Sequence, residues 1–474
     1  MITNKKTASV RGSILAYGLV IMFMISIVLT SIIGFVVSQT KYALQIHARE
    51  QAFQIGESGI HFYRWYLAHQ VEGRTAQQVA DFWATGSPYG VGAPYEVEYV
   101  DPSGSAVGRY RLEVTPPAAG STIVTIKSTG WTYRYPSITR VIQVRFRRPS
   151  WSEYAVMAND NMRFGAGTEV YGKIHSNQGI RFDGIAHNIV TSSISQYDDP
   201  DHGGGNEFAV HTHATTTDPL PPAAVPSRPD VFEVGRSFPE VAVDFNGMLG
   251  DLSFMKSQAQ AGVNGSRYFN NASQGRHIIL KADDTFDIRT VQSFNATTNQ
   301  IINYSGGWAS YTLPDDGIIY VENNVWIEGT INSRRVTVVA ANLISASKKT
   351  MYLGKDIRYT NYDCSEMIGL IGQEDVEVYR ASNNVLRIDA SLIAQSGRVG
   401  RSNYTGPTAI RDTITVYGAI ASNQRYGFAW ADILGNHVSG YINRNLYYDN
   451  NLLYCPPPYF PTGTQYEMDL WQEE

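Results

Sequence analysis

The sequence has 474 residues, a formal net charge of −5 and a low content of charged residues, 17%. It contains no basic tract and no patch of interleaved basic and aromatic residues, so we expect no nucleic-acid partner. No nucleophile elbow, P-loop or dinucleotide fingerprint lies between a predicted strand and a helix. The length suffices for two or three domains.

The N-terminal residues predict a membrane anchor. Lys5, Lys6 and Arg11 come before an uncharged stretch that runs from Ser13 to Thr40. Within it, Ile14–Val37 exceeds the roughly 20 apolar residues that a helix needs to cross a bilayer. Because the cations lie on its N-terminal side, the positive-inside tendency keeps that end in the cytoplasm. We therefore expect a single-pass membrane protein whose head is exported to the periplasm or the cell surface.

Two other interpretations of this segment were weighed. The apolar region of a secretory signal peptide has about 7–15 residues and ends in small residues before the cut. The stretch here is nearly twice as long, and the residues after Val37 match such a site poorly. An ordinary single-pass anchor stays open. Helix-compatible sequence continues past Lys41, so we expect one long helix over 13–70. The apolar residues that follow the predicted membrane segment lie along one face of this helix and form a stripe: Tyr42, Ile46, Phe53, Ile60, Tyr63 and Leu67.

Two motifs in this region resemble a known family. K-K-T-A-S-V-R-G, followed by S-I-L-A-Y-G-L-V-I-M-F-M, resembles a type IV prepilin leader (1–12) and its transmembrane helix. Ala48–Ile60, A-R-E-Q-A-F-Q-I-G-E-S-G-I, resembles the signature of PilX-type minor pilins and of type II secretion pseudopilins. The resemblance implies that a prepilin peptidase cuts between Gly12 and Ser13 and that the new N-terminus is methylated. Tyr17 stands where major pilins carry a glutamate, which favours a tip-type minor pilin over a bulk filament subunit.

The segment 71–149 is predicted to be a small αβ domain. Residues 71–84 are compatible with one more amphipathic helix, and β-type composition follows. Four stretches alternate between apolar and polar residues, as half-buried strands do: Tyr95–Val100, Arg109–Val114, Thr122–Lys127 and Thr139–Arg147. We expect a small antiparallel sheet there. The pilin resemblance implies that this sheet lies against the end of the long helix.

A weak internal repeat marks the region 150–446. Val170–Gln178 recurs as Val416–Gln424, with looser copies at Val325–Ser333 and Leu386–Ser396. Short alternating strands that are followed by a small residue and a polar turn suit the coils of a parallel β-helix. A β-sandwich with similar strands is the alternative. The expected fold class is thus α+β, with a mostly β C-terminal region.

Two insertions interrupt these repeats. Residues 197–236 are rich in Pro, Gly and Thr and are predicted to form an exposed loop without a packed core. Val243–Gly262 has helical spacing and is predicted to form a short surface helix. Oxygen and imidazole ligands for Zn or Ca occur in the first insertion: Asp198, Asp199, Asp201, His202, His211 and His213. Their spacing matches neither an EF-hand loop nor a zincin motif, so we expect a solvated loop with no metal and no cofactor.

Carbohydrate-active enzymes are a further class to weigh, because many β-helix proteins cleave polysaccharides. Their chemistry needs paired carboxylates on one face of the coils, and the candidates here are Asp363, Glu366, Glu374, Asp375 and Glu377. Adjacent residues of a strand point to opposite faces, so Glu374 and Asp375 are poor partners. We expect no enzymatic activity and no catalytic residue.

The two cysteines and the C-terminal tail complete the sequence. An exported domain meets an oxidising compartment, so Cys364 and Cys455 are a candidate disulfide, with two buried thiols as the alternative. The tail 447–474 is dense in aromatic residues and prolines, and proline cannot extend a strand ladder. We expect it to cover the open end of the β region.

Together these features predict a minor-pilin-like, membrane-anchored structural subunit that assembles into or primes a type IV pilus or a related pseudopilus. Its expected partners are the inner or cytoplasmic membrane, other pilin subunits and the pilus assembly platform. The head is expected to contact a surface, through carbohydrate or another protein. Two alternatives stay open: an anchored carbohydrate-active or carbohydrate-binding β-helix protein, and an envelope scaffold outside any filament.

Overall fold

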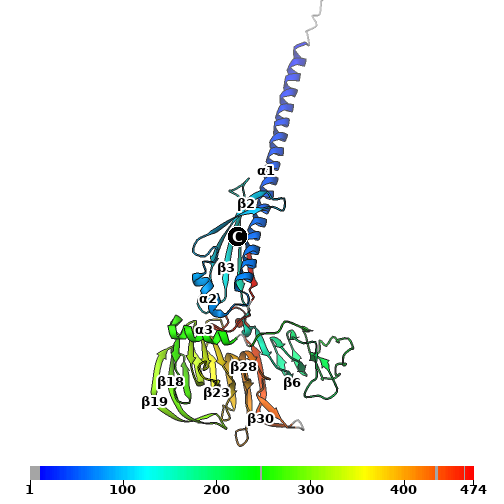
Figure 1. Cartoon of the computed structure of the whole chain (residues 1–474). Helices are drawn as coiled ribbons and strands as arrows, with labels where there is room; N and C mark the ends of the chain where they lie inside the picture. Colours follow the sequence, from blue (N-terminus) through cyan, green and yellow to red (C-terminus); the bar gives the residue numbers. More distant parts are fainter. Residues whose placement is uncertain (1–10, 246–247, 433–435, 464, 474) are drawn as a thin grey trace, which may run out of the picture.

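The computed structural model describes residues 11–245, 248–432, 436–463 and 465–473. A long helix leads into a small sheet, and a large head of stacked strands lies beyond the sheet (Figure 1). The chain thus combines an N-terminal apolar helix with a mostly β C-terminal region, as predicted. Of the predicted leader 1–12, residues 1–10 lie outside the described residues.

The two N-terminal helices follow the predicted order. Helix α1 (Arg11–Val71) has 61 residues, and helix α2 (Ala76–Thr85) follows after a short turn. Thr75 caps α2: its side chain accepts a hydrogen bond from the Gln78 amide, and the Gln78 side chain accepts one from the Thr75 amide. This capping box satisfies amide groups that the first turn of a helix leaves without partners. The additional helix predicted over 71–84 is therefore present.

A five-stranded antiparallel sheet lies against the C-terminal half of α1. Its strands, in spatial order, are β1 (Tyr95–Val100), β2 (Ala106–Thr115), β3 (Val124–Thr132), β4 (Thr139–Arg147) and β31 (Glu467–Glu473). Buried and half-buried residues alternate along β3 without a break, because one face of the sheet packs on the helix. The four strands predicted from alternation are present. The fifth comes from the end of the chain and was not predicted.

The head begins after β4 and contains most of the remaining strands. Its first part comprises η1 (Trp151–Glu153), β5 (Tyr154–Ala158), β6 (Met162–Phe164), β7 (Glu169–Val170), β8 (Lys173–Ser176), β9 (Ile180–Phe182), β10 (Ile185–Ala186), β11 (Val190–Ser192), β12 (Gln196–Tyr197), β13 (Glu207–Phe208), β14 (Val210–His211) and β15 (Arg236–Ser237). Helix α3 (Met248–Ala261) follows, as predicted, and then η2 (Val263–Gly265).

The second part of the head returns through a longer series of strands. These are β16 (Arg267–Phe269), β17 (Gly275–Lys281), β18 (Thr285–Asn295), β19 (Gln300–Thr312), β20 (Gly317–Val321), β21 (Asn324–Ile331), β22 (Arg335–Ala340), β23 (Met351–Tyr359), β24 (Met367–Gly372), β25 (Val376–Val378), β26 (Val385–Ala394), β27 (Val399–Gly400), β28 (Ile410–Ser422), β29 (Ala429–Ala431) and β30 (His437–Tyr448). A short helix, η3 (Asn450–Leu453), closes the series.

Most of these strands pair in parallel. One ladder runs β16–β20–β22–β24–β26–β28–β5–β8–β11–β15, and every pairing in it is parallel. A second parallel ladder runs β17–β21–β23–β26–β28–β30–β7–β10. Strands β17, β18 and β19 form an antiparallel extension at one end, which the sequence patterns did not predict.

The chain enters this stack in its middle. Strand β5 pairs with β28, so the first part of the head builds outward from the place where the second part ends. Figure 1 shows β6 at one end of the head, β18 and β19 at the other, and β28 between them. One column of buried residues follows the first ladder from strand to strand: Ile319, Val338, Leu370, Leu392, Ile420, Val156, Ile174 and Val190. The repeated motif therefore corresponds to positions that stack on one another.

Two predicted segments differ from the structure. The insertion 197–236 contains buried residues, among them Val210, Val231 and Phe232, which belong to the core of the head. The density of Pro and Gly obscured the short strands β12, β13 and β14 within it.

The tail 447–474 also differs from the prediction, because it does not cover the open end of the stacked strands. Pro458 lies along the side of the ladder, where its carbonyl accepts a hydrogen bond from Thr337 at 2.5 Å. The chain then returns to the small sheet, where β31 pairs with β4. Prolines keep the first part of the tail out of the ladders, and only the proline-free end forms a strand.

Candidate functional site: the N-terminal helix and the sheet that holds it

The N-terminal part of α1 is apolar and extends away from the rest of the protein (Figure 1). Its large hydrophobic side chains are exposed on every side of the helix, from Ile14 at 74% to Val37 at 47%. Among the described residues, this is the one helix that is long and apolar enough to cross a membrane. The Ile14–Val37 segment would span roughly 36 Å at 1.5 Å per residue, enough for a bilayer core of about 30 Å.

Three serine and threonine side chains inside this segment form hydrogen bonds within the helix itself. The hydroxyls of Ser26, Thr30 and Ser31 each donate to the carbonyl oxygen four residues earlier, at 2.8–2.9 Å. Thr40 does the same at 2.8 Å. A hydrocarbon environment offers no partner for a free donor, so this pattern makes the segment compatible with lipid. The structure therefore supports a single-pass anchor.

The C-terminal half of α1 is held by the small sheet. Ile60, Tyr63 and Leu67 of the predicted stripe are fully buried in the core between helix and sheet, whereas Tyr42 and Ile46 remain exposed. The buried part of the stripe thus stabilises the head-side half of the helix. The exposed part lies between the membrane segment and the sheet.

Glycines let the helix approach the sheet closely. Ser128 of β3 donates a hydrogen bond of 2.7 Å to the carbonyl oxygen of Gly56. A β-carbon on Gly59 would lie 2.5 Å from Ser128 Oγ, and one on Gly130 would lie 2.2 Å from the Ala52 carbonyl oxygen. Both distances are shorter than any ordinary contact, so only glycine fits. The A-R-E-Q-A-F-Q-I-G-E-S-G-I motif therefore lies where the helix crosses the sheet.

The predicted cleavage positions lie at the very start of the helix. Helix α1 begins at Arg11, so the peptide bond between Gly12 and Ser13 falls in its first turn. No acidic residue lies in that turn. Tyr17, at the position discussed above, is 68% exposed.

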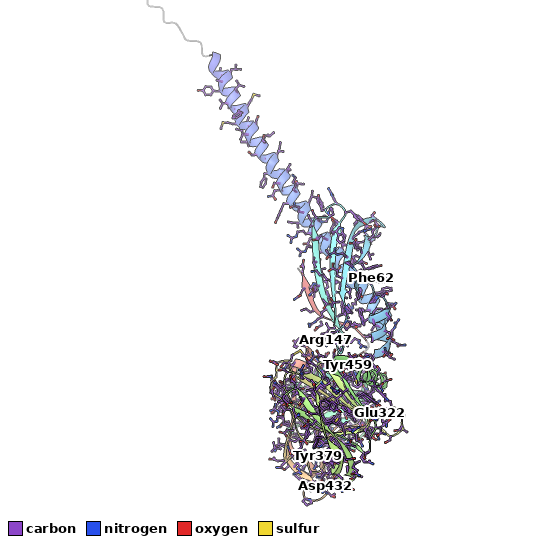
Figure 2. All side chains as sticks on the ribbon, turned by 90° about the vertical axis from the view of Figure 1, so that its left-hand side faces the viewer. Phe62, Arg147, Glu322, Tyr379, Asp432 and Tyr459 are labelled. Carbon is purple, nitrogen blue, oxygen red and sulfur yellow. A yellow bond between two sulfur atoms is a disulfide. The ribbon has the colours of Figure 1, made fainter. Side chains whose placement is uncertain are left out.

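Two stretches of chain join the small sheet to the head, side by side. Ser150 forms a bridge with Thr462, and the Trp151 amide donates to the Pro461 carbonyl at 2.9 Å. Asp469 of β31 accepts a hydrogen bond of 2.6 Å from Arg145 Nε and lies 3.3 Å from Arg147 Nε. Figure 2 shows Arg147 at this junction. The head is therefore inserted into the small sheet between β4 and β31, and not simply attached to its end.

The two cysteines are bonded to each other. Cys364 and Cys455 form a disulfide with their Cα atoms 5.7 Å apart, 91 positions apart in the sequence. Cys455 follows η3, and Cys364 lies in the turn before β24. The bond ties the start of the tail to the side of the stack.

The candidate catalytic carboxylates have structural partners. Glu366 is buried and accepts hydrogen bonds from the amides of Ser333, at 3.1 Å, and Asn361, at 3.1 Å. Glu377 is buried as well and accepts from the Ser402 amide and the Tyr404 hydroxyl, both at 2.7 Å. Burial raises the pKa of Glu377, and the hydrogen bonds from Tyr404 and Ser402 oppose that effect.

The remaining three carboxylates lie nearer the surface. Asp375 accepts a hydrogen bond of 2.7 Å from the Arg398 amide, while Asp363 and Glu374 are exposed. The Asp363 carboxylate accepts from the Ser365 amide at 3.1 Å within its own turn. Asp363 and Asp375 therefore stabilise a turn and a neighbouring strand.

The acidic and histidine-rich residues of the insertion were expected to be solvated, and for part of them that expectation is wrong. Asp199 is 4% exposed and His211 1%, because β13 and β14 pack into the head. His213 is partly buried as well, and all three lie close to Glu207, which the sequence patterns did not single out. Asp198, Asp201 and His202 lie outside this group.

Comparisons with known proteins give little further information. No known family profile matches the chain, and none of the curated proteins matches it. Among solved structures, the chain is similar to the crystal structure of a competence-associated pilin, ComZ, from Thermus thermophilus. The sequence identity is 11% and the TM-score is 0.32, with 90% of this chain and 98% of that chain covered. At this TM-score the likeness carries no weight for function, which rests on the residues described above.

Proposed function

We propose that this chain is a pilin-like, membrane-anchored subunit that assembles into, or primes, a type IV pilus or a related pseudopilus. The observation that carries the proposal is the division of α1 into two halves. One half is apolar and exposed on all sides, and the other is buried against an antiparallel sheet. A helix built in this way can lie in lipid and later pack beside the helices of other subunits without losing its attachment to the head.

The N-terminal motif specifies the proposal further. A prepilin peptidase would remove the leader 1–12 by cutting between Gly12 and Ser13, and the cations before the cut would keep that end in the cytoplasm. The head would then be exported. Tyr17 in place of the usual glutamate supports a minor subunit of the PilX type, because the subunit lacks the carboxylate that pairs with a neighbouring N-terminus in the bulk filament.

We infer that the head is a parallel β-helix. The two long parallel ladders and the continuous column of buried residues between Ile319 and Val190 support this interpretation over a sandwich, whose sheets are typically antiparallel. The rigid stack would be displayed at the end of the helix and would contact a surface, a carbohydrate or another protein. The proposed units are the leader, the helix to 70, the small sheet to 149 with β31, and the head.

We propose that the role is structural and not enzymatic. Four of the five candidate carboxylates stabilise a turn or a neighbouring strand: Asp363, Glu366, Asp375 and Glu377. Carboxylates that accept several backbone hydrogen bonds are committed to the fold. An anchored carbohydrate-binding protein and an envelope scaffold remain the alternatives that an experiment must separate.

The test is incorporation into filaments. The full chain is expressed in a pilus-forming host with its prepilin peptidase, and surface filaments are sheared off and probed for the protein. We expect the wild type and the control Gly165→Ala in the sheared fraction, because Gly165 lies in the head and a β-carbon there meets nothing within 4 Å. Gly12→Asp should remain in the membrane with its leader attached. A scaffold would remain in the membrane in all three cases.

A further inference from the structure

Four side chains with metal-binding groups converge beside the head. Asp199, Glu207, His211 and His213 each offer one ligand atom, and these atoms all lie within 4.8 Å of one another. Asp199, Glu207 and His211 are 4%, 3% and 1% exposed. Two carboxylates and two imidazoles are therefore gathered in a place from which water is largely excluded.

The local fold explains how they meet. Strand β13 pairs with β12, and β14 pairs with β9, with a bend at Ala209 between the two strands. Glu207 of β13, His211 of β14 and His213 just after β14 bring their ligand atoms to one place. Asp199 approaches from the turn after β12, where its Oδ1 accepts a hydrogen bond of 3.0 Å from the Asp201 amide.

Three buried acceptor atoms in this cluster have no hydrogen-bond partner. They are Asp199 Oδ2, Glu207 Oε2 and His211 Nε2. The other ring nitrogen of His211, Nδ1, lies 3.1 Å from the Phe208 carbonyl oxygen and must donate its proton there. His211 Nε2 lies 2.9 Å from Glu207 Oε2 and 3.6 Å from Asp199 Oδ2, so it is directed at both carboxylates.

Two buried carboxylates that meet at one imidazole nitrogen are unfavourable without a positive charge between them. The nearest fixed cation is Arg181, whose Nη1 lies 3.6 Å from Asp199 Oδ2. Its Nε already donates to Asp183 Oδ2 at 2.8 Å, so its charge is largely balanced. His202 lies at the rim, with its Nδ1 2.9 Å from Glu207 Oε1. His213 Nε2 lies 2.7 Å from the same carboxylate oxygen. Apart from histidines, the two buried carboxylates thus have beside them the charge of Arg181, which Asp183 shares.

We propose that Asp199, Glu207, His211 and His213 bind one divalent transition-metal ion of the Zn²⁺ class. Imidazole nitrogen and carboxylate oxygen are ordinary zinc ligands, and four protein ligands with no open position are typical of a structural site. Ligands about 2.1 Å from a tetrahedral ion lie about 3.4 Å from one another. The 2.9 Å between His211 Nε2 and Glu207 Oε2 would therefore widen, and separations of up to 4.8 Å in the cluster would shorten. The bond between His211 Nδ1 and the Phe208 carbonyl orients the ring as outer partners of zinc ligands do.

The ion would tie together two parts of the insertion. Asp199 belongs to the turn after β12 and the other three ligands to the segment from β13 onward, so one ion would close the loop between the two strands. This inference is independent of the proposed function, because it concerns the head alone and holds whether or not the chain enters a filament.

The experiment uses the purified full chain in detergent. The protein is stripped with EDTA, dialysed, incubated with ZnCl₂ and desalted, and the bound zinc is measured by mass spectrometry. We expect one ion per chain, a melting temperature raised by zinc and lowered again by EDTA, and visible d–d absorption after Co²⁺ loading. His211→Gln should weaken zinc binding by at least about 100-fold, since even outer partners contribute about 10–100-fold.

Two further variants keep the test decisive. His277→Gln is the matched control: this histidine lies 2.8 Å from Glu328 elsewhere in the head and should leave the zinc content unchanged. His213→Gln replaces the partly exposed ligand and serves if His211→Gln does not fold, as judged by circular dichroism. Absence of bound zinc in the wild type, or equal zinc in the wild type and both ligand variants, would overturn the proposal and indicate a proton shared between His211 and Glu207.

Discussion

Ser128 of the sheet and Gly56 of the long helix are joined by a hydrogen bond of 2.7 Å, although they lie 72 positions apart in the sequence. The contact lies within the part of the helix that packs on the sheet, which extends toward the apolar half at least as far as the buried Ala48. Small residues on both elements, Gly59 and Gly130 among them, permit the backbones to approach. The attachment of the anchor to the head therefore depends on these glycines, which have no side chain, as well as on the hydrogen bond from Ser128.

The close approach of helix and sheet predicts a strong effect of one added methyl group. In Gly130→Ala, the new β-carbon would lie 2.2 Å from the Ala52 carbonyl oxygen and 2.4 Å from the Gly56 amide nitrogen, both backbone atoms. We expect a loss of about 3 kcal/mol in the unfolding free energy of the helix–sheet unit, at the upper end of overpacking costs. Thermal unfolding measures it. Gly165→Ala, whose β-carbon meets nothing within 4 Å, is the control and should melt like the wild type.

The disulfide predicts a redox-dependent stability of the head. Removing it in the double variant Cys364→Ser, Cys455→Ser frees a loop whose ends are 91 positions apart. The chain-entropy relation gives a cost of about 4 kcal/mol for a loop of this size. We expect the wild type with reductant and the double variant to unfold at the same lowered temperature. A melting temperature of the wild type that reductant does not change would contradict this expectation.

The return of the tail to the small sheet predicts that Asp469 stabilises the junction with the head. Asp469→Asn removes the charge that faces Arg145 and Arg147, whose side chains are only partly exposed. We expect a loss of about 2 kcal/mol, as for hydrogen bonds between charged groups. Chemical denaturation of both variants measures the difference. Glu467→Gln, on the same strand but exposed, should stay within about 0.5 kcal/mol of the wild type.

Asp251 of α3 predicts a specific pH dependence. Burial raises the pKa of its carboxyl from 3.8 to about 6, against the opposing influence of Arg148. The folded state therefore keeps this proton over a pH window in which the unfolded state has lost it. Stability must fall as the pH rises from about 4 to about 6.

Asp251→Asn removes the group that titrates. The variant should be more stable than the wild type at pH 8, by about 1–2 kcal/mol once residual solvent access is allowed for. The difference should vanish near pH 4, where the wild-type carboxyl is protonated in the folded state. Melting curves at the two pH values check this. An equal gain at both values would show that the effect is steric and not due to ionisation.

Local patterns in the sequence were sufficient for the elements that depend on local spacing. The apolar run after Arg11, the alternation in β1 to β4 and the helical spacing in α3 each reflect contacts on one face of a short segment. The repeat between Val170–Gln178 and Val416–Gln424 has the same origin, since Ile174 and Ile420 both pair with Val156.

Such local patterns do not predict which strands pair when the strands are far apart in the sequence. Strand β31 pairs with β4, although more than 300 residues separate the two strands in the sequence. No pattern within β31 indicates that β4 is its partner. The same holds for the entry of the chain in the middle of the stack. In the insertion, prolines and glycines masked the strands, and Glu207 was missed. Its spacing of four and six residues from His211 and His213 was the signal that would have found it.

The most direct test of the central proposal is the N-terminus of the mature protein. Mass spectrometry of the chain purified from membranes of a host with an active prepilin peptidase identifies its first residue. We expect the mature chain to begin at Ser13 and to remain in the membrane fraction. An intact Met1–Gly12 segment would contradict processing as a pilin, and a soluble chain that begins after Val37 would contradict the membrane anchor itself.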